Sequence, residues 1–111
     1  MSYDQNNIFA KILRGEIPCD KIYEDEYILS FKDINPQAKI HILIIPKGPY
    51  IDVADFLHNA KTQYQTSFWA SVNTIIDSLD LRDRGFQIKT HKGKDGGQEV
   101  FHFHLHLLSN S

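Results

Sequence analysis

Three histidines occupy alternate positions near the C-terminus: His102, His104 and His106, within Val-Phe-His-Phe-His-Leu-His-Leu-Leu (100–108). Side chains in a β-strand alternate between the two faces, so a strand here would point all three imidazoles the same way. Histidine is the side chain whose unperturbed pKa lies closest to neutrality. The row therefore indicates proton transfer, metal binding or nucleophilic attack.

Three interpretations of this row compete. The rings could occupy a solvated sheet face, or two of them could share a zinc ion with His41 or His91 as a third ligand. In the third interpretation, one imidazole is a nucleophile whose neighbours fix its tautomer and hold the transferred group. The preceding loop favours this one, since Gly93, Gly96 and Gly97 let backbone N–H groups turn toward an anion. The same glycines would also suit a hairpin that only needs a tight turn.

The bulk composition narrows the class of protein. The chain has 111 residues, 41% of them hydrophobic, which suffices for one core, so we expect a single domain over residues 1–111. A formal net charge of −2 gives no general attraction to nucleic acid or to a membrane. Cys19 is the only cysteine, which excludes an intramolecular disulfide and a cysteine-rich zinc site. The N-terminal residues do not resemble a signal peptide, so we expect a cytoplasmic protein.

Apolar spacing and turn residues predict the elements that must hold the histidines. We expect a short helix over 7–14 and a long one over 52–80, where apolar residues recur every three or four positions. β-type runs are expected over 21–24, 27–32, 39–46, 86–91 and 99–108. The short links between strands favour antiparallel pairing. The prediction is an α+β fold, a five-stranded antiparallel sheet with one short N-terminal helix and one long helix.

The sequence resembles a known family. The run 102–108 matches the His-φ-His-φ-His-φ-φ signature of the histidine-triad (HIT) superfamily, in which φ is apolar. Further segments, in the same order along residues 7–108, resemble its Hint-type branch of nucleoside phosphoramidases. They are Ile8-Phe9-Ala10-Lys11-Ile12, Gly15-Glu16-Ile17-Pro18, Phe31-Lys32-Asp33-Ile34-Asn35-Pro36-Gln37-Ala38, His41-Ile42-Leu43-Ile44-Ile45-Pro46-Lys47 and Asp95-Gly96-Gly97-Gln98.

This resemblance implies a hydrolase that needs neither metal nor cofactor and cleaves the P–N bond of purine nucleoside 5′-phosphoramidates, of the AMP-amine or AMP-lysine type. His104 would attack the α-phosphorus and carry a covalent nucleotidyl group. His106 would hydrogen-bond the phosphate and help to protonate the leaving amine. His102 would orient the triad with His41 behind it. Asp33 would accept from the ribose hydroxyls, although an aspartate here could also only shape the turn.

The resemblance also assigns residues around the bound nucleotide. His91 stands where this branch typically has Asn, beside the phosphate, and Gln98, Glu99 and Val100 would border the phosphate. An apolar slot would hold the base, formed by Ile8, Phe9, Ile12, Ile17, Phe31 and Ile34.

Two further expectations concern metals and partners. Some relatives bind zinc through paired cysteines, and those positions are Asn7 and Ala10 here, so we expect no metal. The resemblance implies a homodimer with the long helix and the strand near 86–91 at the interface, and Trp69 beside the apolar stripe is compatible with this. The alternative function is a regulatory module that binds purine nucleotides with little turnover.

Overall fold

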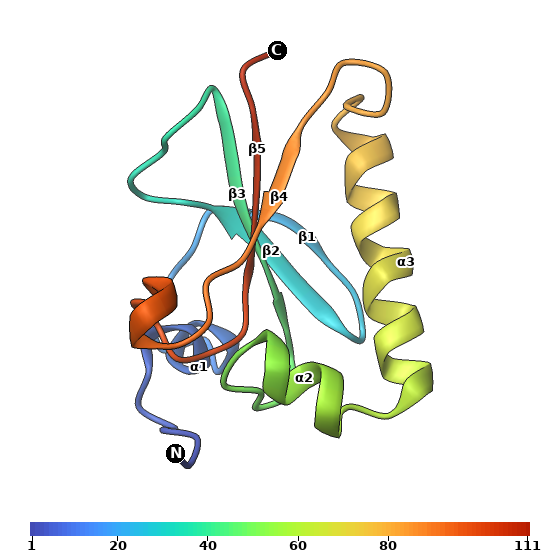
Figure 1. Cartoon of the computed structure of the whole chain (residues 1–111). Helices are drawn as coiled ribbons and strands as arrows, with labels where there is room; N and C mark the ends of the chain where they lie inside the picture. The colour runs from blue at the N-terminus through green and yellow to red at the C-terminus, as the bar shows by residue number, and fades with distance from the viewer.

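The computed structural model describes all 111 residues as one five-stranded antiparallel sheet with three α-helices (Figure 1). The strand order is β1-β2-β3-β5-β4, with every neighbouring pair antiparallel. This confirms the predicted α+β fold. In chain order the elements are α1 (Ile8–Leu13), β1 (Lys21–Glu24), β2 (Ile28–Lys32), β3 (Ile40–Pro46), α2 (Val53–Asn59), α3 (Thr62–Ser78), β4 (Gln87–Lys89), the 3₁₀ turn η1 (Lys94–Gly96) and β5 (Leu105–Ser109).

The short N-terminal helix is confirmed. The side chain of Asn7 caps α1 by accepting from the backbone N–H of Ala10 at 2.9 Å. Gly15, with φ of +79°, follows the helix, and a residue with a side chain would be strained there. The helix buries the side chains of Phe9 and Ala10, and this burial fixes the orientation of the helix against the sheet.

The sheet has two differently covered sides, because alternate residues of the central strands point to opposite faces. α1 and α3 lie on opposite sides of it (Figure 1). We call the side packed against α2 and α3 the α3 face and the side packed against α1 the α1 face. The α3 face holds thirteen buried residues: Ile28, Ile42, Ile44, Phe56, Ala60, Phe68, Val72, Ile75, Ile76, Leu81, Phe103, Leu105 and Leu107. The α1 face holds five: Phe9, Leu29, Phe31, Leu43 and Ile45.

The single long helix predicted over 52–80 is wrong. It is divided into α2 and α3, because Ala60 and Lys61 are extended, with ψ of 139° and 146°. The side-chain amide of Gln65 donates to the carbonyls of Ala60 at 2.9 Å and Leu57 at 3.2 Å, which satisfies acceptors left open where α2 ends. The apolar spacing continues across the break, so spacing alone could not locate it. None of the helices combines the length and apolarity that crossing a bilayer requires.

The predicted strand over 99–108 is too long at its start. β5 begins at Leu105, where its pairing with β3 starts opposite Ile44, and its pairing with β4 starts one residue later, between His106 and Lys89. The backbone N–H of Phe103 instead donates to the carbonyl of Tyr50 at 2.7 Å. Strand β4 is likewise shorter than the predicted 86–91, and all three of its residues are exposed at the sheet edge.

Candidate active site

A cavity of about 370 Å³ opens on the α1 face, between α1, the turn after β2, and the loop leading into β5. It is lined by all six residues predicted for the apolar slot, Ile8, Phe9, Ile12, Ile17, Phe31 and Ile34, and by six other predicted residues, Asp33, His91, Glu99, Val100, His104 and His106. His41, His102 and Gln98 are the predicted residues that do not line it. The structure therefore brings most of the predicted set together around one space.

The apolar part of the cavity has a buried floor and an exposed rim. Phe9 is 7% exposed and meets Phe31 edge-on, with ring centroids 5.6 Å apart. Ile34 is 89% exposed and Ile8 43% exposed, although both line the cavity. A flat apolar ligand could cover such a rim and remove it from water.

His104 is held in one tautomer by the backbone. Its Nδ1–H donates to the carbonyl oxygen of His102 at 2.7 Å, so in the neutral ring the lone pair is on Nε2. The ring is nearly buried and lines the cavity, and Phe9 packs edge-on against it with centroids 5.0 Å apart. Burial, the largest influence, lowers its pKa below the ordinary 6.5. A neutral imidazole with a free Nε2 at the cavity wall is suited to nucleophilic attack.

His102 is completely buried behind His104. Its Nε2–H donates to the carbonyl of Pro46 at 2.8 Å, and its Nδ1 accepts from the hydroxyl of Tyr3 at 2.5 Å. Burial, more than any other influence, lowers its pKa to about 4, so it is neutral at neutral pH. Tyr3 was not among the predicted residues.

The tautomer of His106 follows from a chain of hydrogen bonds. The backbone N–H of Gln37 donates to Nδ1 of His41 at 3.0 Å, so the proton of neutral His41 is on Nε2. This Nε2–H donates to Nδ1 of His106, 3.0 Å away, which leaves the proton of His106 on its own Nε2. Burial and then the nearby imidazoles, His104 first, lower the pKa of His106 to about 4. The cavity is thus lined by an imidazole acceptor, His104, and an imidazole donor, His106.

Asp33 combines two contacts. Its Oδ1 accepts from the backbone N–H of Asn35 at 2.8 Å, so it does shape the turn. Its Oδ2 lies 3.3 Å from Nε2 of His41, and the side chain also lines the cavity. The turn-shaping interpretation and a contact with ligand hydroxyls are geometrically compatible.

One group of side chains could hold a metal ion: Asp33, His41 and His106, whose ligand atoms lie within 4.8 Å of one another. The zinc interpretation had assumed two rings of the triad with His41 or His91. His104 is not in the group. A metal here would replace the proton that His41 and His106 share.

The loop before β5 is tied down by Gln98, whose side chain is turned away from the cavity. Its Oε1 accepts from the N–H of Gly93 at 2.8 Å, and its Nε2 donates to the carbonyls of Ile51 at 2.8 Å and Val100 at 3.0 Å. The expectation that Gln98 borders the phosphate applies at most to its backbone. Nδ1–H of His91 donates to the carbonyl of Gly96 at 2.9 Å, which leaves Nε2 of that ring free in the neutral form.

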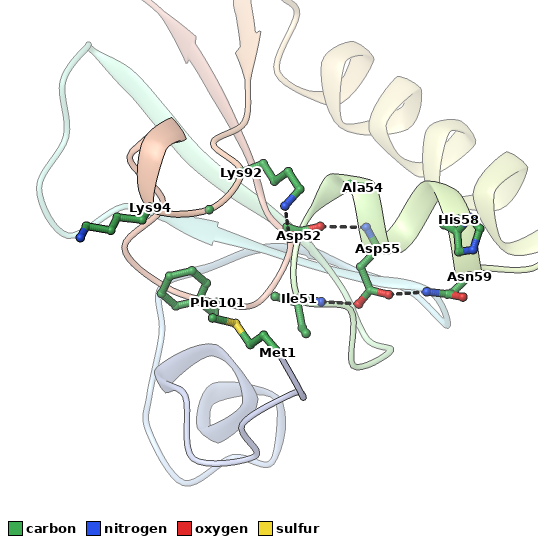
Figure 2. Close-up of a pocket in the computed structure, with 11 residues that line it drawn as sticks. Met1, Ile51, Asp52, Ala54, Asp55, His58, Asn59, Lys92, Lys94 and Phe101 are labelled. Carbon is green, nitrogen blue, oxygen red and sulfur yellow. Dashed lines mark hydrogen bonds and ion pairs between the residues drawn. The ribbon is translucent and has the colours of Figure 1, made fainter.

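A larger cavity of about 700 Å³ lies between α2, Lys92 and Phe101, and Figure 2 shows that several of its polar groups pair with one another. Lys92 lies 3.4 Å from Asp52, and Asp55 accepts from the N–H of Ile51 and from the amide of Asn59 (Figure 2). None of the triad histidines lines it. The larger of the two cavities is therefore not the one that the triad histidines line.

Comparison with known proteins agrees with this arrangement. The HIT domain family matches residues 14–111. An uncharacterized 13.2 kDa HIT-like protein of Azospirillum brasilense is 44% identical over 108 residues, covering 97% of this chain and 88% of that protein.

Two solved structures extend the comparison. A HIT family hydrolase from Legionella pneumophila superposes with a TM-score of 0.87 at 36% identity, covering 96% of this chain and 94% of that one. A histidine triad nucleotide-binding protein from Candida albicans gives a TM-score of 0.81 at 33% identity, covering 92% of this chain and 73% of that one. Sequence, fold and the row of imidazoles all agree, and the chain belongs to the HIT domain family.

Proposed function

We propose that this protein is a hydrolase that cleaves the P–N bond of purine nucleoside 5′-phosphoramidates through a nucleotidyl group carried on His104. The observation that carries the proposal is the His104 ring, which lines the cavity with Nδ1–H fixed on a carbonyl and Nε2 unprotonated. Members of the family described as hydrolase and as nucleotide-binding protein add support.

The reaction would take place in two displacements at phosphorus. Nε2 of His104 attacks the α-phosphorus as the P–N bond breaks, and the amine nitrogen takes a proton from His106. Water then attacks the phosphorus, the bond to His104 breaks, and the proton of the water returns to His106. The sum is phosphoramidate plus water giving nucleoside monophosphate plus amine, with no metal or cofactor required.

His106 must be protonated to act as the acid, although burial lowers its pKa in the free protein to about 4. A bound phosphoryl group supplies the missing charge, because an anion within hydrogen-bonding distance favours the imidazolium. In the covalent intermediate, the cationic His104 ring keeps its Nδ1–H on the carbonyl of His102, and a charged donor strengthens that bond.

The rest of the cavity would position the nucleotide. The apolar slot takes the purine, with Phe9 and Phe31 at its floor and Ile34 at its rim. Asp33 accepts from the ribose hydroxyls, and His91, Glu99 and the Val100 backbone border the phosphate. Glu99 is an exposed carboxylate on this lining, so we propose that it favours cationic leaving amines.

The homodimer stays a proposal as well. Strand β4 lies at the sheet edge, and three large apolar side chains near the expected interface are partly exposed: Trp69 at 44%, Phe86 at 39% and Ile88 at 38%. Covering such residues favours association. Sedimentation at several protein concentrations would show the dimer, and a mass of one chain throughout would refute it.

A panel of adenosine phosphoramidates, assayed with EDTA present, tests the hydrolase. We expect turnover, and a radiolabelled adduct on the wild-type protein after quenching in alkali. His104→Ala should lose the adduct and at least about 1,000-fold of the rate. His58→Ala, a histidine of the larger cavity, is the matched control and should retain both. Tight AMP binding without turnover would favour the regulatory module, and loss of activity with EDTA would favour zinc.

A further inference from the structure

The N-terminal segment before α1 reaches the back of the histidine row. The hydroxyl of Tyr3 lies 2.5 Å from Nδ1 of His102, although 99 positions separate the two residues. Their rings also meet edge-on, with centroids 5.6 Å apart. Tyr3 does not line the nucleotide cavity, so this contact has no direct part in holding a ligand there.

We infer that Tyr3 is a positioning residue for the nucleophile, acting through His102, an inference that rests on the proposed function. The His102 ring is held at both nitrogens, by the Tyr3 hydroxyl at Nδ1 and by the Pro46 carbonyl at Nε2. The carbonyl of His102 is in turn the acceptor that orients His104. Two hydrogen bonds, with His102 between them, thus connect the N-terminal segment to the attacking ring.

The direction of the first bond is fixed by the second. Because Pro46 offers only a carbonyl oxygen, the His102 proton is on Nε2, and Nδ1 must accept from the Tyr3 hydroxyl. No other group bonds this Nδ1, and the ring has no exposed surface, so water does not replace the phenol. Without the hydroxyl, a buried acceptor would lack a partner.

The segment that carries Tyr3 is anchored at the next two residues, Asp4 and Gln5. Asp4 accepts from the backbone N–H of Asn6 at 2.8 Å through its side chain and from the side-chain amide of Asn7 at 2.8 Å through its carbonyl. The guanidinium of Arg14 donates to the carbonyl of Gln5 at 2.8 Å. These contacts join the segment to α1. Tyr3 is therefore held at the triad by α1 and not by its own hydroxyl alone.

The expected role is specific to the chemical step. Attack by His104 needs the ring aligned with the phosphorus, and a small misplacement of a reacting group lowers the rate strongly. Loosening His102 would therefore slow formation of the nucleotidyl adduct. It would not weaken nucleotide binding, because neither Tyr3 nor His102 lines the cavity.

Tyr3→Phe tests this, because it removes the hydroxyl and keeps the ring. Tyr23→Phe is the matched control, since the Tyr23 hydroxyl donates to Asp25, remote from the triad. We expect Tyr3→Phe to lower kcat and the single-turnover rate of adduct formation about tenfold. KM and the affinity for AMP should change less than about twofold, and Tyr23→Phe should leave all of these unchanged.

Imidazole ¹⁵N NMR supplies a readout that does not need turnover. The Nδ1 resonance of His102 should move in Tyr3→Phe and stay in place in Tyr23→Phe. A lower melting temperature with kcat unchanged would overturn the inference and leave Tyr3 a purely structural residue. A wild-type protein that turns over no phosphoramidate would refute the proposed function instead, and the His102 resonance would then still show whether Tyr3 holds that ring.

Discussion

The two faces of the sheet are built from the same strands but differ in content. The α3 face is a dry core in which the rings of Phe56, Phe68 and Phe103 pack with centroids 4.9 to 5.4 Å apart. The α1 face has fewer buried apolar residues and adds buried His41, His102 and His104 beside an open cavity. Burying imidazoles and leaving a cavity both lower stability. The difference indicates that the α3 face stabilises the fold enough for the α1 face to hold reactive groups.

The largest expected effect is on stability, from truncating a side chain in the core of the α3 face. Phe68→Ala should lower the free energy of unfolding by about 3–5 kcal/mol, because the side chain is fully buried among aromatic rings. Its kcat/KM, measured where the protein is still folded, should stay near the wild-type value. Urea unfolding measures the loss of stability, and steady-state kinetics measure kcat/KM.

Phe9→Leu is the counterpart on the α1 face. It should cost less stability, about 1 kcal/mol, and should lower kcat/KM, because Phe9 packs edge-on against His104. If both variants lost activity only in proportion to their loss of folded protein, the division between the faces would be wrong.

The next prediction concerns how kcat/KM and the free energy of unfolding change as the pH is lowered. Attack needs neutral His104, whose pKa lies below the ordinary 6.5, so the loss of kcat/KM caused by protonation of this ring should begin only below pH 6.5. The free energy of unfolding should also fall between pH 6.5 and about 4, because the unfolded chain takes up protons at His102 and His106 that the folded chain resists.

Both trends can be measured on one set of samples, with pH–rate profiles and urea titrations. Phe68→Ala is the control, because its stability should lie below that of the wild type by a similar amount at each pH. If the decline of kcat/KM on the acid side had its midpoint at or above pH 6.5, burial would not keep the attacking ring neutral.

The smallest expected effect is at the exposed edge of the α1 face. Glu99→Gln should lower the preference for a lysine-like amine over a neutral amine by about two- to fivefold, because charge pairing in water is weak. The preference should also shrink as salt is added. Asp95→Asn, an exposed carboxylate outside the cavity lining, is the control. An unchanged ratio in Glu99→Gln would remove Glu99 from leaving-group selection.

The spacing of residues along the sequence predicted which side chains lie on the same face of a strand. The alternation of His104 and His106 with Leu105 indicated which side chains share a face, although only part of that segment is a strand. The division between α2 and α3 was missed, because the apolar spacing continues across it and the extended residue Ala60 carries no breaking signal.

Contacts between distant parts of the chain were also missed. The hydroxyl of Tyr3 meets His102, and the amide of Gln98 meets Ile51, through single polar atoms that leave no period in the sequence. Such partners become visible only when the fold places them side by side. The resemblance supplied the expected roles of most cavity residues, and it had nothing to say of Tyr3.

The pairing of β3 with β5 sets Leu43 opposite His106 and Ile42 opposite Leu107. Inserting or deleting a single residue in either strand would exchange the two sides, moving imidazole into the α3 core and leucine into the cavity of the α1 face. The register of β3 and β5 therefore determines both the packing of the core and the side on which the imidazoles lie. Over evolutionary time, any length change here that cells tolerate must fall in the turns, and a designer who wants a new substrate should likewise graft loops and leave these two strands untouched.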